Sequence, residues 1–325
     1  MTVRAVPHDD PDARRLWAEE WRELEGRYGP LSDPAELEPD GLVASFVGYV
    51  AGEAIGTVVV RFASYDGRAP EAELKRLYVA PGHRGNGHAR VLMGAAEDTA
   101  LRAGATRVIL ETGDKQPEAV ALYRAIGYST IPNFGKWAHS RHSICMAKDL
   151  PTRVLVVSGT IAAGKTTVAG AVADMLGVRG VRSAWIDADS LAQASPPPVG
   201  DHFNQGLMFA ALEAIAPVYR ERGFGAIVVP RVVANDDDRR RYATAFAGPG
   251  GAAQVSLIRV TASEATRRAR IEAREPEGKW RDWSLARTVE LDEALEDGGY
   301  EDAVVENDGR ELEATVIAVL DAAGW

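Results

Sequence analysis

The run Gly159–Thr166 has the pattern G-x-x-x-x-G-K-[ST] and directly follows the apolar stretch Val154–Val157. This pattern requires a buried strand, a glycine loop and a helix, which we place at Thr167–Leu176. Backbone N–H groups of such a loop point at phosphate oxygens, the Lys165 ammonium reaches the β and γ phosphates, and the Thr166 hydroxyl holds Mg²⁺. We therefore predict that the second half binds ATP or another nucleoside triphosphate. The predicted nucleotide-binding residues are Gly159, Thr160, Ile161, Ala162, Ala163, Gly164, Lys165, Thr166 and Thr167.

The chain has 325 residues, of which 46% are apolar, so it is long enough to form two buried cores. A strand-like segment ends near Lys148, and Pro151 with adjacent charged residues precedes the phosphate-loop strand. We predict two domains, residues 1–150 and 151–325.

The formal net charge of −10 disfavours nucleic acid as a partner, because phosphate backbones require clustered Lys and Arg, and it favours cationic or neutral small substrates. The single cysteine, Cys145, excludes an intrachain disulfide and fits a reducing compartment. Residues 1–30 lack an export signal, and no apolar run approaches the roughly eighteen residues that span a membrane. We expect a cytoplasmic protein, and its oligomeric state stays open.

The order of helices and strands in the first half predicts a mixed α+β domain. Apolar spacing indicates helices at 12–27, 89–103 and 117–125, and strands at 42–50, 54–63, 74–79, 107–111 and 143–147, the first three of them an antiparallel meander.

A glycine loop, Arg84–Ala89, stands at a predicted strand-to-helix turn, where bare N–H groups and the helix dipole favour a pyrophosphate. Glu73–Val79 precedes it and Gln116–Tyr128 follows. Residues 3–150 with these segments resemble the GNAT family of acetyl-CoA-dependent N-acetyltransferases. The resemblance implies a GNAT fold and acetyl-CoA contacts from Leu77, Tyr78, Val79, Arg84, Gly85, Asn86, Gly87, His88 and Ala89.

By the same resemblance, Tyr123 corresponds to the tyrosine that protonates the departing CoA thiolate, although it also suits an ordinary aromatic at the edge of a core. Glu73 corresponds to a carboxylate that deprotonates the substrate ammonium. The alternative for Glu73 is an ion pair with Lys75 or Arg76. Glu111 is a second candidate base, and the segments that select the amine correspond to residues 9–39 and 131–142.

The second half lacks the apolar strand ending in Asp that motor and switch ATPases use, since Ala226–Val229 runs into Pro230 and Arg231. Carboxylates instead follow a strand near Trp185, at Asp187 and Asp189. Residues 153–325 therefore resemble the small-molecule P-loop kinases that include adenylylsulfate, shikimate, gluconate and chloramphenicol kinases. This resemblance implies an α/β/α sandwich with a parallel sheet.

Carried over by position, Asp187 is the favoured base for the substrate hydroxyl, and Asp189 is a ligand of Mg²⁺ or of the substrate. Arg231 contacts the phosphoryl acceptor. The alternative is that one aspartate, Asp189 in particular, only caps a helix that starts near Ser190.

Arg267, Arg270 and Arg274 fall on one helical face at spacings of three and four. In the related kinases such arginines form a lid that neutralises charge on the transferring phosphoryl group. Arg270 and Arg274 are the first candidates for this catalytic role. The alternative is a solvated basic face paired with Glu264 and Glu272.

These observations predict a bifunctional enzyme that acetylates small-molecule amines with acetyl-CoA and phosphorylates small-molecule hydroxyls with ATP and Mg²⁺, by analogy an antibiotic- or metabolite-modifying protein. One alternative makes the first domain a protein or peptide acetylase. Another makes it a non-catalytic, acetyl-CoA-sensing regulatory domain. The sequence leaves open both substrates and whether one molecule serves both sites.

Overall fold

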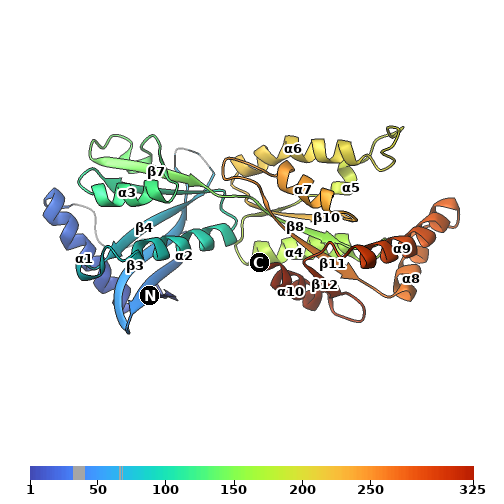
Figure 1. Ribbon diagram of the computed structural model, residues 1–325, viewed down its shortest axis with the longest axis horizontal. Helices are drawn as coiled ribbons and strands as arrows, with labels where there is room; N and C mark the ends of the chain where they lie inside the picture. The colour runs from blue at the N-terminus through green and yellow to red at the C-terminus, as the bar shows by residue number, and fades with distance from the viewer. Residues whose placement is uncertain (32–40, 66, 68) are drawn as a thin grey trace. The chain divides into compact units, whose positions relative to one another are not determined.

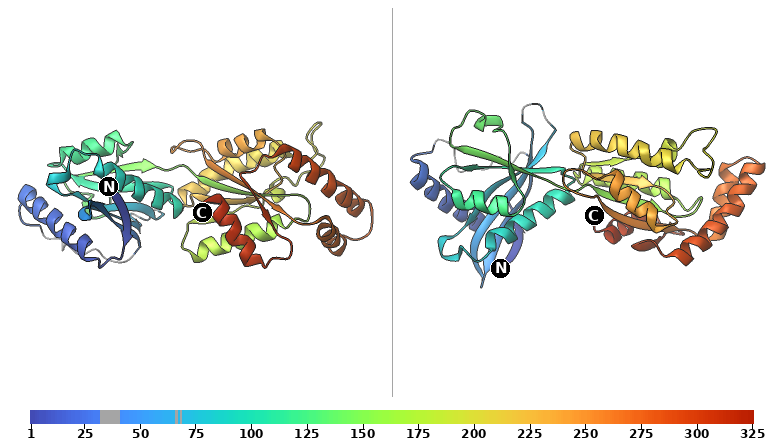
Figure 2. Two further views of the ribbon diagram at one scale, coloured as in Figure 1. Left: turned by 60° about the horizontal axis from the view of Figure 1, so that its bottom comes forward. Right: turned by 45° about the horizontal axis from the view of Figure 1, so that its top comes forward.

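The computed structural model describes residues 1–31, 41–65, 67 and 69–325. These residues form two compact units, Met1–Leu150 and Pro151–Trp325, each built on a sheet of its own (Figures 1 and 2). In the described ranges, no helix is long and apolar enough to cross a membrane. Positions 32–39 of the predicted amine-selecting segment 9–39 lie outside the described residues.

The first unit has the mixed α+β architecture that the sequence predicts. Its elements are β1 (Thr2–Val6), α1 (Pro11–Tyr28), β2 (Leu42–Val50), β3 (Glu53–Ala63), β4 (Glu71–Val79), the 3-10 turn η1 (Pro81–His83), α2 (His88–Arg102), β5 (Arg107–Gly113), α3 (Pro117–Ala125), β6 (Ser129–Thr130), the 3-10 turn η2 (Gly135–Trp137) and β7 (Ser143–Asp149).

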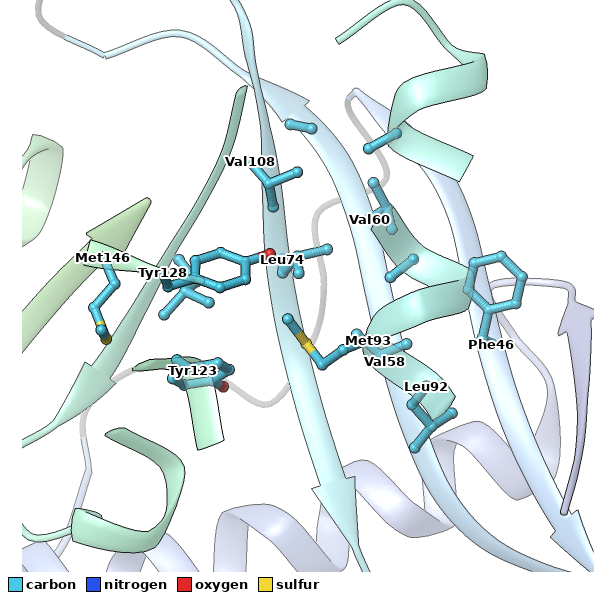
Figure 3. Close-up of a cluster of buried hydrophobic side chains, with 14 of the residues drawn as sticks. Phe46, Val58, Val60, Leu74, Leu92, Met93, Val108, Tyr123, Tyr128 and Met146 are labelled. Carbon is cyan, nitrogen blue, oxygen red and sulfur yellow. The ribbon is translucent and has the colours of Figure 1, made fainter. Parts of the chain in front are cut away.

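The strands of this unit form one sheet in the order β1-β2-β3-β4-β5-β7-β6, in which only β4 and β5 run parallel. Apolar residues of α2 and α3 cover one face, where Leu74, Leu92, Met93 and Tyr123 belong to the core in Figure 3. Helix α1 packs Leu16 against the other face. The sheet is therefore covered by helices on both faces, as apolar strand residues require.

The two parallel strands at the centre of this sheet part after a short pairing. Only Ala72–Leu74 of β4 pair with residues 108–110 of β5, although both strands continue. A bulge follows at once, because Arg76 and Leu77 together face Val58 of β3 and Arg76 has a left-handed φ of 57°. Beyond Leu74, the β5-facing edge of β4 is thus left without a strand partner.

The second unit is an α/β/α sandwich. Its elements are β8 (Arg153–Ser158), α4 (Lys165–Val178), β9 (Ser183–Trp185), α5 (Ala188–Leu191), α6 (Gln205–Glu221), β10 (Ala226–Pro230), α7 (Asp236–Ala245), β11 (Gln254–Thr261), α8 (Glu264–Arg274), α9 (Lys279–Gly298), β12 (Ala303–Glu306) and α10 (Leu312–Ala323).

All five strands of this unit are parallel and lie in the order β12-β11-β8-β10-β9. Side chains alternate along the central strand: Val154 and Val156 pack under α6 and α7, while Leu155 and Val157 pack under α4 and α10 (Figure 1). The predicted parallel α/β/α fold is confirmed, and it places the phosphate loop at the carboxyl end of the central strand, the edge where open α/β sheets bind ligands.

Strands β1 and β11 lack a counterpart in the sequence prediction, for different reasons. Strand β1 is only five residues long and contains exposed and half-buried residues without regular alternation, so its pattern does not indicate a strand. Strand β11 has a buried second half, Leu257–Val260, but Arg259 interrupts the apolar run. Its guanidinium is buried against Glu301, with Nε and Oε1 2.7 Å apart. A compensated charge inside a buried strand is a tertiary feature that local pattern does not show.

Candidate functional sites

A cavity of about 1410 Å³ opens where β4 and β5 part. It is lined by the end of β4, the end of β5, α1, α3 and the turn before α2. Of the predicted cofactor residues, those that line it are Leu77, Tyr78, Val79, Arg84, Gly85, Gly87, His88 and Ala89. Asn86 does not, since its amide donates back to the carbonyl oxygens of His83 and Arg84, each at 3.2 Å.

The turn before α2 fits a pyrophosphate. Gly85 and Gly87 both have a φ of 78°, and a Cβ on either would meet only open space, so glycine is required by backbone conformation and not by packing. Gly87 stands at the N-cap of α2, and no capping side chain accepts a hydrogen bond from the N–H groups of the first turn of this helix. The guanidinium of Arg84 is already engaged by Val79 O and Glu23. The backbone amides and the helix dipole are therefore the groups available to an anion.

Tyr123 projects from α3 into the same cavity and is 6% exposed. Burial, followed by the nearby Glu20 and Glu111 carboxylates, raises the pKa of its phenol above the ordinary value. The hydroxyl therefore keeps its proton at neutral pH and can donate it.

Glu73 is almost completely buried, at 1% exposure, and holds an ion-paired network. Its Oε2 accepts from Arg61 Nε at 2.7 Å and from the Tyr65 hydroxyl at 2.9 Å, while Lys75 Nζ lies 3.3 Å from Oε1. The ion-pair alternative for Glu73 is thus what the structure shows, with Lys75 and Arg61 as partners and not Arg76.

Glu20, Glu23, Glu111 and Glu118 also line the cavity, and two of these carboxyls are deeply buried. Burial raises the pKa of Glu111, and it raises the pKa of Glu20 on α1 to about 7 even though Arg76 lies 3.5 Å away. A carboxyl with a pKa near 7 is suited to take a proton from an ammonium at neutral pH. The sequence prediction missed Glu20, because nothing in the pattern of α1 distinguishes it from Glu19 or Glu23.

In the second unit, the phosphate loop adopts a conformation that needs its glycines. Gly159 and Gly164 have φ values of 144° and 105°. A Cβ on Gly159 would lie 2.3 Å from Val260 O, and one on Gly164 would lie 2.4 Å from Asn307 Nδ2. The loop therefore keeps a bare backbone with N–H groups at the start of α4.

Lys165 is held over this loop by donating from Nζ to Thr160 O at 2.7 Å. Burial lowers the pKa of its ammonium to about 8, opposed by the attraction of Asp189 and reinforced by Arg231 and Arg274. These predicted site residues are thus close enough to interact electrostatically. Thr166 and Thr167 lie exposed on the first turn of α4.

The two predicted aspartates differ in surroundings. Asp187 is the N-cap of α5: it accepts from the N–H groups of Asp189 and Ser190, and from the Ser190 hydroxyl at 2.7 Å. Asp189 is 55% exposed at its side chain and pairs with Arg231. The capping residue is therefore Asp187 and not Asp189, because a cap must directly precede the first helical turn.

The three arginines of α8 differ in burial and in hydrogen-bond partners. Arg267 does not belong with the lid candidates: it is 4% exposed and donates to Ala262 O and to Asp292. Arg270 donates to the loop carbonyls of Ala162 and Ala163.

Arg274 is 58% exposed at its side chain and pairs with Glu275. Two supports of the loop that the sequence did not indicate are Thr288, which donates to Ile161 O at 2.9 Å, and Asn307, which donates to Ala163 O at 2.9 Å.

The first unit thus combines a mixed sheet, a cavity between parted strands and a glycine turn at a helix N-terminus that fits a pyrophosphate. The sequence profile of the Acetyltransferase (GNAT) family matches residues 10–128. An IAA acetyltransferase from Azospirillum brasilense is 34% identical over 133 residues, which are 39% of this chain and 86% of the relative. The chain therefore belongs to the GNAT family of acetyltransferases, and acetyl-CoA is the cofactor that this family uses.

A streptothricin acetyltransferase from Streptomyces lavendulae is 35% identical over 78 residues, 24% of this chain and 40% of the relative. Among solved structures, an acetyltransferase from Streptococcus agalactiae covers 46% of this chain and 98% of its own, at 16% identity and a TM-score of 0.37. A gluconokinase from Sinorhizobium meliloti covers 54% of this chain and 93% of its own, at 19% identity and a TM-score of 0.37.

Proposed function

We propose that this chain is a bifunctional group-transfer enzyme, with an acetyl-CoA-dependent N-acetyltransferase in residues 1–150 and an ATP- and Mg²⁺-dependent small-molecule kinase in residues 151–325. The observation that supports the second activity is the arrangement of charged side chains around the phosphate loop. Lys165 stands at the start of α4, and the Asp189–Arg231 pair follows the carboxyl ends of β9 and β10. Family membership supports the first activity.

In acetyl transfer, the amine nitrogen attacks the thioester carbonyl carbon, the carbon–sulfur bond breaks, and the sulfur takes a proton. Tyr123 is the donor we propose for that proton, since its phenol lines the cavity and is protonated at neutral pH. The ammonium must first lose a proton. Glu20, with a pKa of about 7, suits this step better than Glu73, whose carboxylate is occupied by Arg61 and Tyr65.

In phosphoryl transfer, the loop N–H groups and Lys165 bind the phosphates, and the Thr166 hydroxyl would hold Mg²⁺, which neutralises phosphate charge when bound. Arg270 and Arg274 supply positive charge from α8. We propose that Asp189 orients or deprotonates the acceptor hydroxyl, because both oxygens of Asp187 are used by the cap of α5. Arg231 holds Asp189 in place.

The acceptors we propose are small molecules with an amine and a hydroxyl, in the class of antibiotics or metabolites. The relationship to a streptothricin acetyltransferase supports this class. A mass-shift screen tests it: the protein is incubated with ATP, Mg²⁺ and acetyl-CoA against a panel of such compounds. Gains of one acetyl or one phosphoryl group are expected. Binding of acetyl-CoA without any acetylated compound would instead favour the regulatory alternative for the first unit.

A further inference from the structure

The two ends of the first unit's cavity differ in the groups that line them. The glycine turn and the start of α2 follow Val79, whereas Glu73 and Lys75 lie four to six residues earlier on β4, about 13–20 Å away along the strand. Lys75 lies beside Trp137 of η2, with Nζ 4.6 Å from the ring centroid. Because the turn suits the cofactor pyrophosphate, this opposite end is the place for the amine substrate, and it is called the acceptor end below.

Positive charge exceeds negative charge at the acceptor end. Among the described residues that line it, the cations are Arg61, Lys75, Arg76 and Lys136, and the carboxyls are Glu20, Glu73 and Glu111. Glu20 faces Arg76, 3.5 Å away. Glu73 is shared by two of the cations, at 2.7 Å from Arg61 and 3.3 Å from Lys75. One carboxylate therefore neutralises only one of its two partners.

The remaining groups do not balance this excess. Burial raises the pKa of Glu111, which favours its neutral form, and raises the pKa of the Tyr65 phenol to about 12, so that Tyr65 stays uncharged. Lys136 lies against the same ring as Lys75, with Nζ 5.3 Å from the centroid of Trp137. Burial lowers the pKa of Lys75, and its ammonium shares the Glu73 carboxylate with Arg61. An incompletely compensated cation in a partly desolvated cavity attracts an anion.

We propose that the amine substrate carries a carboxylate or a comparable anionic group, which binds at Lys75 and Arg61 beside Trp137 while its amine faces the acetyl group. This inference rests on the proposed acetyl transfer and names the substrate class for it. It runs against the expectation of a cationic substrate drawn from the net charge of the whole chain, because the local charge at the acceptor end has the opposite sign.

The test uses primary amines in matched triplets: an α-amino acid, its primary amide and its decarboxylated amine. Release of CoA thiol is measured with the full chain. We expect kcat/KM for the carboxylate form to exceed that of both neutral forms by about tenfold or more. In Lys75→Gln, the ratio of kcat/KM for the carboxylate form to kcat/KM for the amide should fall toward one. Lys75→Arg keeps the positive charge and should retain part of the preference for the carboxylate form. Arg14→Gln, an exposed charge on α1, is the matched control and should leave the ratio unchanged.

Two results overturn the inference: a preference for the amide or the decarboxylated amine, or a carboxylate preference that survives in Lys75→Gln. Calorimetry of acetyl-CoA binding distinguishes a failure of this inference from a failure of the proposed function. If acetyl-CoA binds and only uncharged or cationic amines are acetylated, the substrate class is wrong and the acetyltransferase stands. If neither binding of acetyl-CoA nor acetylation of any amine occurs, the proposed function itself is wrong.

Discussion

Burial raises the pKa of two groups in the cavity of the first unit and so determines which of them can donate and which can accept a proton at neutral pH. The phenol of Tyr123 and the carboxyl of Glu20 line the same space, and burial raises the pKa of both. At neutral pH the phenol is a donor, whereas the carboxyl is divided between its two forms and can accept. Groups with such separated pKa values commonly mark the acid and the base of an active site.

Tyr123→Phe should lower kcat for acetyl transfer by about 10²–10⁴-fold, because the departing thiolate loses its proton donor. The ring remains, so packing in the core of Figure 3 and the affinity for acetyl-CoA should change little. CoA thiol release and calorimetry measure the two quantities. An unchanged kcat in folded protein would show that Tyr123 is only a core-edge aromatic.

Glu20 should make the stability of the first unit depend on pH. Its pKa is raised from 4.5 to about 7, mainly by burial, so between these values the folded state binds the proton more tightly than the unfolded state. The free energy of unfolding should therefore decrease as pH rises from about 4.5 to about 7, by up to roughly 3 kcal/mol.

Glu20→Gln removes this titration and should flatten the pH dependence, whereas Glu19→Gln on the same helix should not. Hydrogen exchange of residues 1–150 in urea at several pH values is the measurement. Parallel curves for wild type and Glu20→Gln would contradict the assignment.

The two aspartates near β9 can be separated by substitution with asparagine, which caps a helix about as well as aspartate. Asp187→Asn should keep α5 and most of the phosphoryl transfer. Asp189→Asn removes a carboxylate that pairs with Arg231 and should lower the transfer rate by about 10²-fold or more. Steady-state ADP release with an acceptor found in the screen measures both. The reverse order of effects would restore Asp187 as the base.

At the scale of elements, the phosphate loop is supported by parts of the chain that lie far along the sequence. Arg270 of α8, Thr288 of α9 and Asn307 after β12 each donate to a carbonyl between Ile161 and Ala163. These three hydrogen-bond donors fix the orientation of the loop carbonyls, so the loop keeps its bare backbone N–H groups at the start of α4. The strand-to-helix motif thus depends on the carboxy-terminal third of the chain for its shape.

Gly164→Ala tests this arrangement. A side chain at a φ of 105° is strained by about 1–3 kcal/mol, and its Cβ would strike the Asn307 amide. ATP affinity should fall by about tenfold or more, and the second unit should lose stability. Gly170→Ala in α4, where a Cβ meets nothing within 4 Å, is the matched control and should stabilise by about 0.5–1 kcal/mol. Calorimetry with ATP and thermal denaturation measure the effects, and equal behaviour of the two variants would contradict the argument.

Elements with a strong local signal were predictable. The apolar runs of β2, β8 and β10 and the glycine turns before α2 and α4 specify their own structure. Features decided by distant partners were not. The sequence pattern predicts that Arg267 is a solvated or lid residue, whereas the structure buries it and pairs it with Ala262 O and Asp292. Glu20 differs from Glu19 and Glu23 in its burial, which the sequence pattern does not indicate.

At the scale of the whole molecule, the groups that we propose for the two reactions lie in separate units. We expect the two reactions to be separable. Lys165→Ala should abolish ATP turnover and leave acetyl-CoA consumption within about twofold, because the phosphate loop lies entirely in Pro151–Trp325. Tyr123→Phe should do the reverse. Both activities are measured on each variant, and loss of both in either folded variant would show that the sites are coupled.

The excess of cations around Glu73 also bears on how the first reaction ends. Acetylation removes the ammonium charge of the acceptor and leaves its anionic group, so the product is more negative than the substrate. Lys75 and Arg61 hold such a product at least as well as the molecule from which it formed. Accumulated product should therefore inhibit competitively against the amine. An enzyme of this kind works fastest where another process removes what it makes.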